Sequence, residues 1–228
     1  MTRFERSFVW TGGGLFVLSL AACAYSYGVI WGSTVAGAGA VRAVVFNALL
    51  FAIFAGHHSL FAREFIKHRL VRIVPPPLLR SFYVWTASVL LLVVLALWQP
   101  VPGELYGVAG WRAIGHAVLQ LCGLWVIARS VSRIDALELA GIRPASGRDA
   151  LQITGPYRWV RHPLYLGWIL VVFGAAHMTG SRFEFAAIST GYLLIAIPWE
   201  ERSLGDAFGP AYADYQRAVR WRVVPFVY

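Results

Sequence analysis

The sequence predicts an all-α integral membrane bundle of about six transmembrane helices with a C-terminal amphipathic interfacial helix. Of the 228 residues, 58% are hydrophobic and only 14% are charged. A soluble domain needs about 25% charged residues to solvate its surface, so this composition argues against a soluble Rossmann-type enzyme. The spacing of the charged residues gives the second observation, because six long stretches contain none.

Each charge-free stretch predicts one spanning helix, since about 17–25 apolar residues cross the hydrocarbon of a bilayer. The first stretch holds a helix and a Gly- and Ala-rich loop near Gly32 to Gly39. The fourth and sixth stretches are short. Arg129 can snorkel from the fourth helix, and the sixth, which ends at Pro198-Trp199, is expected to lie obliquely or under its neighbours. The six stretches are residues 7–41, 43–62, 81–103, 113–128, 162–181 and 185–199.

The basic residues predict the topology. With six spans and a cytoplasmic N-terminus, the opposite face receives only Arg42, Arg112 and Arg182, while the other 17 of the 20 Lys and Arg residues face the cytoplasm. The positive-inside rule therefore predicts a multi-pass protein with both termini in the cytoplasm. The net charge of +9 then reflects topology and does not indicate a nucleic-acid partner.

An apolar stripe follows the sixth predicted span. Leu204, Phe208, Tyr212, Tyr215 and Val219 recur at helical spacing, with polar residues between them and Gly209-Pro210 as an interruption. This pattern predicts an amphipathic element at the membrane surface, acting as an anchor or as a lid over the fifth and sixth spans.

Two cysteines do not support a metal centre. Cys23 and Cys122 both lie inside apolar runs, which indicates neither a disulfide framework nor a thiolate metal cluster.

The segment from Thr154 to Gly167 leads into the predicted fifth span. Pro163 suits the first turn of a helix, where its missing N–H costs nothing. The free backbone N–H groups of that turn, with Arg158 and Arg161 beside them, favour an anion. The two arginines are equally suited to anchoring lipid phosphates.

Two adjacent carboxylates, Glu200 and Glu201, close the predicted sixth span. The fifth and sixth spans form an antiparallel hairpin, so these carboxylates return to the membrane face at which His162 lies. Carboxylates at the end of an apolar helix are costly to bury, which makes a functional role the default expectation. The resulting pocket would carry both positive and negative charge and suit a zwitterionic ligand. The alternative is that the two glutamates form structural ion pairs with Arg161 and Arg202.

These residues carry a resemblance to a known family. The sequence resembles the isoprenylcysteine carboxyl methyltransferase and phospholipid methyltransferase superfamily of integral membrane enzymes that use S-adenosylmethionine. The resemblance covers the C-terminal third and rests on Gly155-Pro156-Tyr157, Arg161-His162-Pro163-x-Tyr165-x-Gly167, Glu200-Glu201-x-x-Leu204-x-x-x-Phe208-Gly209, Tyr212-x-x-Tyr215 and Pro225.

The resemblance implies where the methyl donor binds. The chain is expected to be a single membrane methyltransferase domain over residues 1–228, with the cofactor half at about 150–228. It implies S-adenosylmethionine as cofactor and no metal. The residues that it places at the cofactor are His162, Pro163, Tyr165, Gly167, Glu200 and Glu201.

The N-terminal part narrows the resemblance to the branch that contains methanethiol S-methyltransferases and nurim. The matching segments are His58-Ser59-Leu60-x-Ala62-Arg63, Ile73-Val74-Pro75, Arg80-Ser81-x-Tyr83, Trp98-Gln99-Pro100-x-Pro102 and His177-Met178-Thr179. The loop from Ile134 to Gln152 departs from the pattern, which leaves the branch less specific than the superfamily.

The favoured acceptor is a small thiol such as methanethiol, entering from the bilayer side. A thiol with a pKa near about 8.5 is mostly neutral at pH 7, so a cation or base would assist it. Arg161, His58 and Arg63 are the candidates. The His57-His58 pair also permits a polar helix-end cluster or haem ligands, although no histidine is expected to face it across the bundle.

Two alternatives to thiol methylation stay open. One is methylation of a prenylcysteine carboxylate or of a phospholipid amine. The other is a non-catalytic, nurim-like membrane protein in which the motifs only stabilise the hairpin.

Overall fold

The computed structural model describes residues 2–37, 39–61, 64–132, 136–143 and 150–228. The chain divides into two compact units. Unit 1 comprises Met1–Gly103 and Asp135–Gly147, and unit 2 comprises Glu104–Ile134 and Arg148–Tyr228. Each unit is described by itself.

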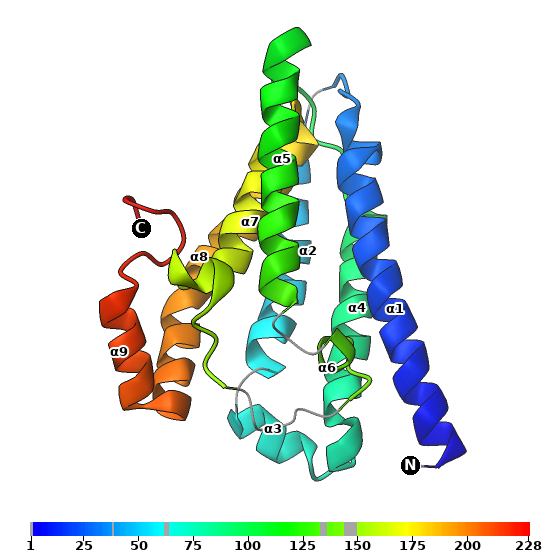
Figure 1. Cartoon of the computed structure of the whole chain (residues 1–228). Helices are drawn as coiled ribbons and strands as arrows, with labels where there is room; N and C mark the ends of the chain where they lie inside the picture. Colours follow the sequence, from blue (N-terminus) through cyan, green and yellow to red (C-terminus); the bar gives the residue numbers. More distant parts are fainter. Residues whose placement is uncertain (1, 38, 62–63, 133–135, 144–149) are drawn as a thin grey trace. The chain divides into compact units, whose positions relative to one another are not determined.

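Unit 1 is helical throughout the elements that the structure describes. Its three long helices are α1, α2 and α4, and short helices connect or flank them (Figure 1). The elements are α1 (Arg3–Gly28), η1 (Ile30–Gly32), α2 (Ala40–Phe61), α3 (Glu64–Leu70), η2 (Pro76–Leu78), α4 (Leu79–Leu97) and α6 (Ala136–Leu139). The loop predicted near Gly32 to Gly39 is confirmed for the described residues, since α1 ends at Gly28, η1 ends at Gly32 and α2 begins at Ala40.

Small and polar side chains join the helices of unit 1. Trp85 of α4 lies against Gly12 of α1, where an added Cβ would be 2.7 Å from the indole ring, and its Nε1 donates to the Phe8 carbonyl at 2.9 Å. The fully buried Asn47 of α2 both donates to and accepts from the Gln99 backbone, at 2.8 and 2.9 Å. A buried amide satisfied on both sides fixes the depth of α2 beside the end of α4.

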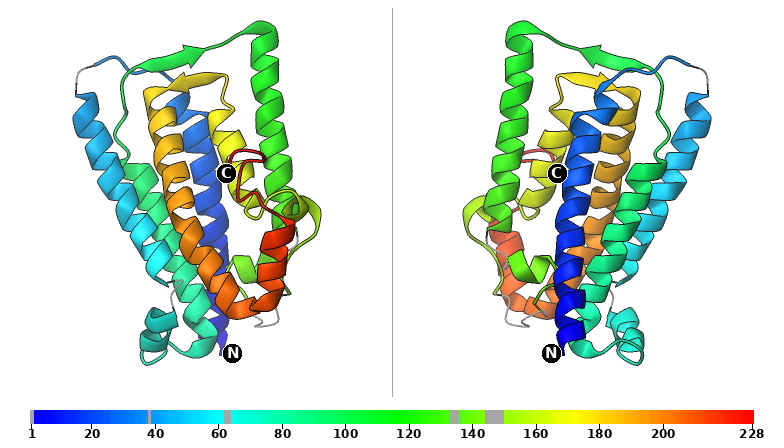
Figure 2. Two further views of the ribbon diagram at one scale, coloured as in Figure 1. Left: turned by 90° about the vertical axis from the view of Figure 1, so that its left-hand side faces the viewer. Right: turned by 90° about the vertical axis from the view of Figure 1, so that its right-hand side faces the viewer.

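Unit 2 holds the other helices and a two-stranded sheet (Figure 2). The elements are β1 (Glu104–Gly107), α5 (Gly110–Val131), η3 (Gly155–Arg158), α7 (Pro163–Phe173), β2 (His177–Thr179), α8 (Gly180–Phe208) and α9 (Pro210–Ala218). Strands β1 and β2 pair antiparallel, and His177 Nε2 lies 3.1 Å from Glu104 Oε2 across the pair.

Glycine contacts and one hydrogen bond set the positions of α5, α7 and α8. Gly167 of α7 packs on Gly123 of α5 so closely that a Cβ on Gly167 would lie 2.8 Å from the Gly123 carbonyl oxygen. Trp168 of α7 donates from Nε1 to Ser189 Oγ of α8 at 2.9 Å. The chain reverses between α7 and α8 at β2, so the start of α7 lies beside the far part of α8.

Four helical segments of the described residues are long and apolar enough to cross a membrane. They are Arg3–Gly32, Ala40–Phe61, Pro76–Leu97 and Gly110–Val131, and they make this a multi-pass membrane protein. The predicted count of six is not confirmed. The predicted fifth span has only the 11 residues of α7 before the chain leaves the helix and forms β2. The predicted sixth span lies inside α8, a 29-residue helix that continues past Pro198 and includes Glu184, Glu200 and Glu201.

Candidate functional site

The start of α7 and the far part of α8 meet in unit 2 through the residues of the sequence motifs. The Tyr165 hydroxyl donates to Glu200 Oε2 at 2.5 Å. The His162 ring lies between both carboxylates, with Nδ1 3.5 Å from Glu200 Oε2 and Nε2 3.4 Å from Glu201 Oε1. The two rings also stack, with centroids 5.2 Å apart. The predicted convergence of His162 with both glutamates is therefore confirmed.

Glu201 is held by two arginines. Arg161 donates from Nε to its Oε1 at 2.7 Å, and Arg222 Nε lies 3.2 Å from its Oε2. Burial by itself raises the pKa of the Glu201 carboxyl, but the hydrogen bond and charge of Arg161, with the charges of Arg222 and His162, outweigh it and hold that pKa below its ordinary value. Glu201 is thus an ionised carboxylate whose two oxygens already have partners.

The adjacent carboxylates differ in exposure. The side chain of Glu201 is 7% exposed and that of Glu200 is 44% exposed. Successive residues of a helix point about 100° apart, which explains how Glu201 is buried while Glu200 stays partly exposed. Of the two, Glu200 is the carboxylate that a ligand can reach.

The segment after α9, residues 219–228, is bound along the start of α7; we call it the C-terminal strap. The Arg161 N–H donates to the Trp221 carbonyl at 2.9 Å, and the His162 N–H donates to the Arg222 carbonyl at 2.7 Å. Arg161 Nη1 also donates to the Val219 carbonyl at 2.9 Å. These bonds use two backbone N–H groups just before the first turn of α7. Binding of an anion there would therefore depend more on side chains than the sequence suggested.

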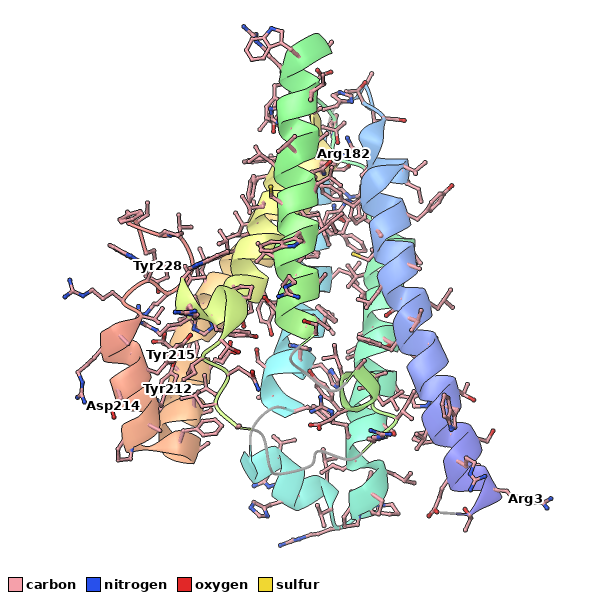
Figure 3. All side chains as sticks on the ribbon, in the orientation of Figure 1. Arg3, Arg182, Tyr212, Asp214, Tyr215 and Tyr228 are labelled. Atoms are coloured by element: carbon pink, nitrogen blue, oxygen red, sulfur yellow. The ribbon has the colours of Figure 1, made fainter. Side chains whose placement is uncertain are left out.

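Helix α9 packs against the far part of α8 through its apolar stripe. Tyr212, Tyr215 and Val219 are buried, with Leu204 and Phe208 packed against them. Figure 3 shows Tyr212 and Tyr215 on the side of α9 that faces α8. Burial and the nearby Glu201 raise the pKa of Tyr212 to about 12, so this phenol is neutral at physiological pH. The residues of the predicted stripe therefore pack together, while an amphipathic helix at a membrane surface stays a prediction.

A groove of about 540 Å³ adjoins this cluster. Its walls are mostly apolar, with one cation and one anion, and the residues are Leu151, Ile153, Arg158, Ala211, Asp214, Tyr215, Ala218 and Val219. The hydroxyl of Tyr215 donates to the Tyr157 carbonyl at 2.8 Å, which ties α9 to η3. Its volume is within the range of small-molecule sites, although the motif side chains Arg161 and Glu201 contact one another directly and do not line it.

The remaining residues of the predicted cofactor set have structural surroundings. Pro163 is buried at the first position of α7, as predicted from its missing N–H. Gly167 lies in the α5–α7 interface against Gly123 and Ile127, so the contacts found for it are packing contacts. Arg161 was predicted near the acceptor, but its side chain is 8% exposed and its guanidinium is hydrogen-bonded to Glu201 and the strap.

His58, a second predicted acceptor-side residue, belongs to unit 1. The Tyr83 hydroxyl lies 2.6 Å from His58 Nδ1, and the rings of His57 and Tyr83 stack 5.8 Å apart. His58 therefore has a polar partner on α4 within hydrogen-bonding distance. Arg63, the other acceptor-side candidate, lies outside the described residues.

Arg222 is the member of the cluster that the sequence did not indicate. The sequence offered Arg202 as a structural partner for the glutamates, whereas Arg222 is the second arginine that reaches Glu201. No local spacing relates Arg222 to α8, because α9 intervenes and the chain turns back before the strap. The pattern Arg220-x-Arg222 after the apolar stripe is the one local signal that could have drawn attention to it.

Comparisons with known proteins identify sequence relatives of this chain. The family model described as phospholipid methyltransferase matches residues 111–211. A protein named methanethiol S-methyltransferase from Mycobacterium tuberculosis is 37% identical over 189 residues, which is 78% of this chain and 77% of the relative. Methanethiol S-methyltransferase 2 of Bradyrhizobium diazoefficiens is 36% identical over 78% of this chain and 72% of its own. A methanethiol S-methyltransferase of Pseudomonas deceptionensis is 34% identical over 80% and 73%. No solved structure matches the chain.

Proposed function

This chain belongs to the methanethiol S-methyltransferase family, and we propose that it transfers the methyl group of S-adenosylmethionine to a small thiol. The observation that carries the proposal is the cluster of His162, Tyr165 and Glu200, which presents a carboxylate at the donor motif of a chain with these relatives. A thioether and S-adenosylhomocysteine would be the products.

The side chains of the cluster fit this donor. S-adenosylmethionine carries an ammonium, a carboxylate and ribose hydroxyls, and it supplies a methyl group activated by a sulfonium. Glu200 is exposed enough to accept a hydrogen bond from the ammonium or the ribose. Tyr165 and His162 both contact its Oε2 and so orient the carboxylate. Glu201, which two arginines neutralise, would act by fixing His162 rather than by touching the donor. We assign Arg161 the same positioning role.

The reaction requires little from the protein beyond alignment of the thiol and the methyl donor. The thiolate sulfur forms a bond to the methyl carbon as the bond from that carbon to the sulfonium breaks. Holding the two reactants in line and excluding water can contribute about 7–11 kcal/mol. A low-dielectric site also strengthens a thiolate nucleophile, provided that a base or cation helps it to ionise.

His58 is the acceptor-side base in this proposal. The Tyr83 hydroxyl lies 2.6 Å from Nδ1 and 3.4 Å from Nε2 of this ring, and the imidazole would take the proton of the thiol. Arg63 follows in sequence and would favour the thiolate by its charge. The acceptor enters from the bilayer side, and both termini lie in the cytoplasm, as the distribution of arginines predicts.

Acceptor competition tests the proposal. Purified full-length protein is incubated with methyl-labelled S-adenosylmethionine and equal amounts of methanethiol, a prenylcysteine and phosphatidylethanolamine. Label in dimethyl sulfide supports the thiol assignment. Label only in the other two products keeps the methyltransferase assignment and rejects the thiol. No label and no donor binding would favour the non-catalytic alternative.

A further inference from the structure

Arg222 contacts two motif residues, His162 through its backbone and Glu201 through its side chain. Its carbonyl accepts the hydrogen bond from the His162 N–H at 2.7 Å. Its Nε lies 3.2 Å from Glu201 Oε2. One residue of the strap therefore holds a motif residue of α7 and a motif residue of α8 at once.

We propose that Arg222 is a positioning residue for the donor site, which fixes His162 through its carbonyl and Glu201 through its guanidinium. The assignment rests on the proposed function, because it concerns the geometry that Glu200 offers to the donor. Arg222 itself touches no reacting atom in this assignment.

The surroundings of Glu201 explain why the guanidinium matters. Arg161 and His162 contact Oε1, and Arg222 is the cation at Oε2 among the residues that the structure describes. Glu200, Tyr165, Tyr212 and Tyr215 are further titratable groups that interact with this cluster. Without Arg222, a buried carboxylate oxygen loses its partner, and such a group either turns toward another donor or draws in water. Either change moves the His162 ring, against which Glu200 is placed.

Tyr228 holds the Arg222 side chain from the other direction. Arg222 Nη1 donates to the Tyr228 hydroxyl at 3.0 Å, and its guanidinium lies 5.2 Å from the centre of that ring. The Tyr228 N–H closes the strap by donating to the Val224 carbonyl at 3.0 Å. Two contacts on one guanidinium reduce the rotamers it samples, and a preorganised cation positions its partner better than a mobile one.

The chain offers a matched control in Arg220. Its carbonyl accepts a hydrogen bond from Arg161 Nη1 at 2.9 Å, and its exposed side chain forms no ion pair with the residues that the structure describes. Side-chain substitutions at 220 and 222 leave the backbone bonds of the strap in place. R220A and R222A remove the same charge from the same segment, but only R222A removes the contact to Glu201.

The test compares the full-length wild type, R222A, R222K and R220A in detergent. Calorimetry with S-adenosylhomocysteine gives donor-site affinity, and thermal unfolding from pH 7 to pH 3.5 without ligand gives the acid transition. We expect R222A to weaken binding about three- to tenfold and to move the acid transition up by about half a pH unit. R222K, which keeps the charge, should recover most of both, and R220A should match the wild type.

Several outcomes would overturn the inference. Wild-type affinity and an unshifted acid transition in R222A show that the contact does not matter. Equal losses in R220A and R222A show a general effect of charge. If R222A does not fold, R222Q replaces it, and wild-type binding by R222Q overturns the inference. A wild type that binds no donor contradicts the proposed function, while the acid transition still decides the Arg222–Glu201 contact on its own.

Discussion

Glu201 accepts a hydrogen bond from Arg161 Nε at 2.7 Å, and both side chains are more than nine-tenths buried. A buried pair of this kind adds modest stability, but removing one partner leaves the other charge without compensation. The pair therefore joins α8 to the start of α7, and it leaves Glu200 as the more exposed of the two adjacent carboxylates.

The two glutamates should respond differently to neutralisation. Glu201→Gln leaves Arg161 and Arg222 facing a neutral amide, and we expect a loss of about 3–5 kcal/mol in unfolding free energy. Glu200→Gln should keep the thermal stability but weaken donor binding by about 1–3 kcal/mol, since it removes a charge-assisted contact. Thermal unfolding and calorimetry on both variants check this. Equal stability of the two would contradict the structural difference between them.

Acid should weaken the fold through Glu201. Its pKa is held below the ordinary value of 4.5 by Arg161, Arg222 and His162, despite burial. A depressed folded-state pKa stabilises the protein above the unfolded-state pKa, and that stabilisation is lost as the pH falls through the folded-state value. We expect an unfolding temperature that drops on acidification below about pH 4.5, and a smaller drop in Glu201→Gln. An identical acid profile in the two proteins would assign the transition to other groups.

Gly167 should be needed for packing and not for binding the donor. A Cβ there would lie 2.8 Å from the Gly123 carbonyl oxygen, which is backbone and cannot rotate away. Gly167→Ala should cost about 1–3 kcal/mol of stability by separating α5 from α7. Gly191→Ala in α8, where an added Cβ meets no atom within 4 Å, is the control. A Gly167→Ala protein with normal stability but no donor affinity would instead place this glycine at the ligand.

The acceptor-side assignment predicts a pH-dependent defect. His58→Ala should lower thiol methylation at least about tenfold at pH 7 and much less at pH 9, because alkaline solvent ionises the thiol unaided. Arg63→Gln should behave in the same way, and donor affinity should stay unchanged in both. His68→Ala, an exposed histidine of α3, serves as the control. A defect of equal size at both pH values would make His58 a structural residue.

The sequence was sufficient to predict that His162 and the two glutamates meet. The reason is geometric: an antiparallel hairpin of two apolar segments must return to the face from which it started, so the residues at its two ends converge. The structure brings the His162 ring within 3.4 and 3.5 Å of the two carboxylates, in agreement with that convergence. The loop near Gly32 to Gly39 was predictable for a similar local reason, since glycine-rich sequence rarely continues a helix.

Other features depended on contacts that no local pattern encodes. The length of α7 was not readable from an apolar run of 20 residues, because β2 forms only when His177–Thr179 finds Glu104–Gly107 as a partner. The unequal exposure of Glu200 and Glu201 required the rotation of α8, which its packing sets. Arg222 belongs to the same class, because the strap reaches the cluster only after α9 has turned the chain back.

The bonds between the strap and the α7 motif have a consequence for biosynthesis. Arg161 is separated by 58 residues from Val219, whose carbonyl accepts a hydrogen bond from the Arg161 guanidinium. At about 5–20 residues per second, a ribosome takes about 3–12 seconds to make that interval. Throughout that time the backbone N–H groups of Arg161 and His162, and the Arg161 guanidinium, still lack the carbonyl partners that the strap provides. Translation that stopped before residue 219 would release a chain with all its predicted donor-binding residues and an unassembled site.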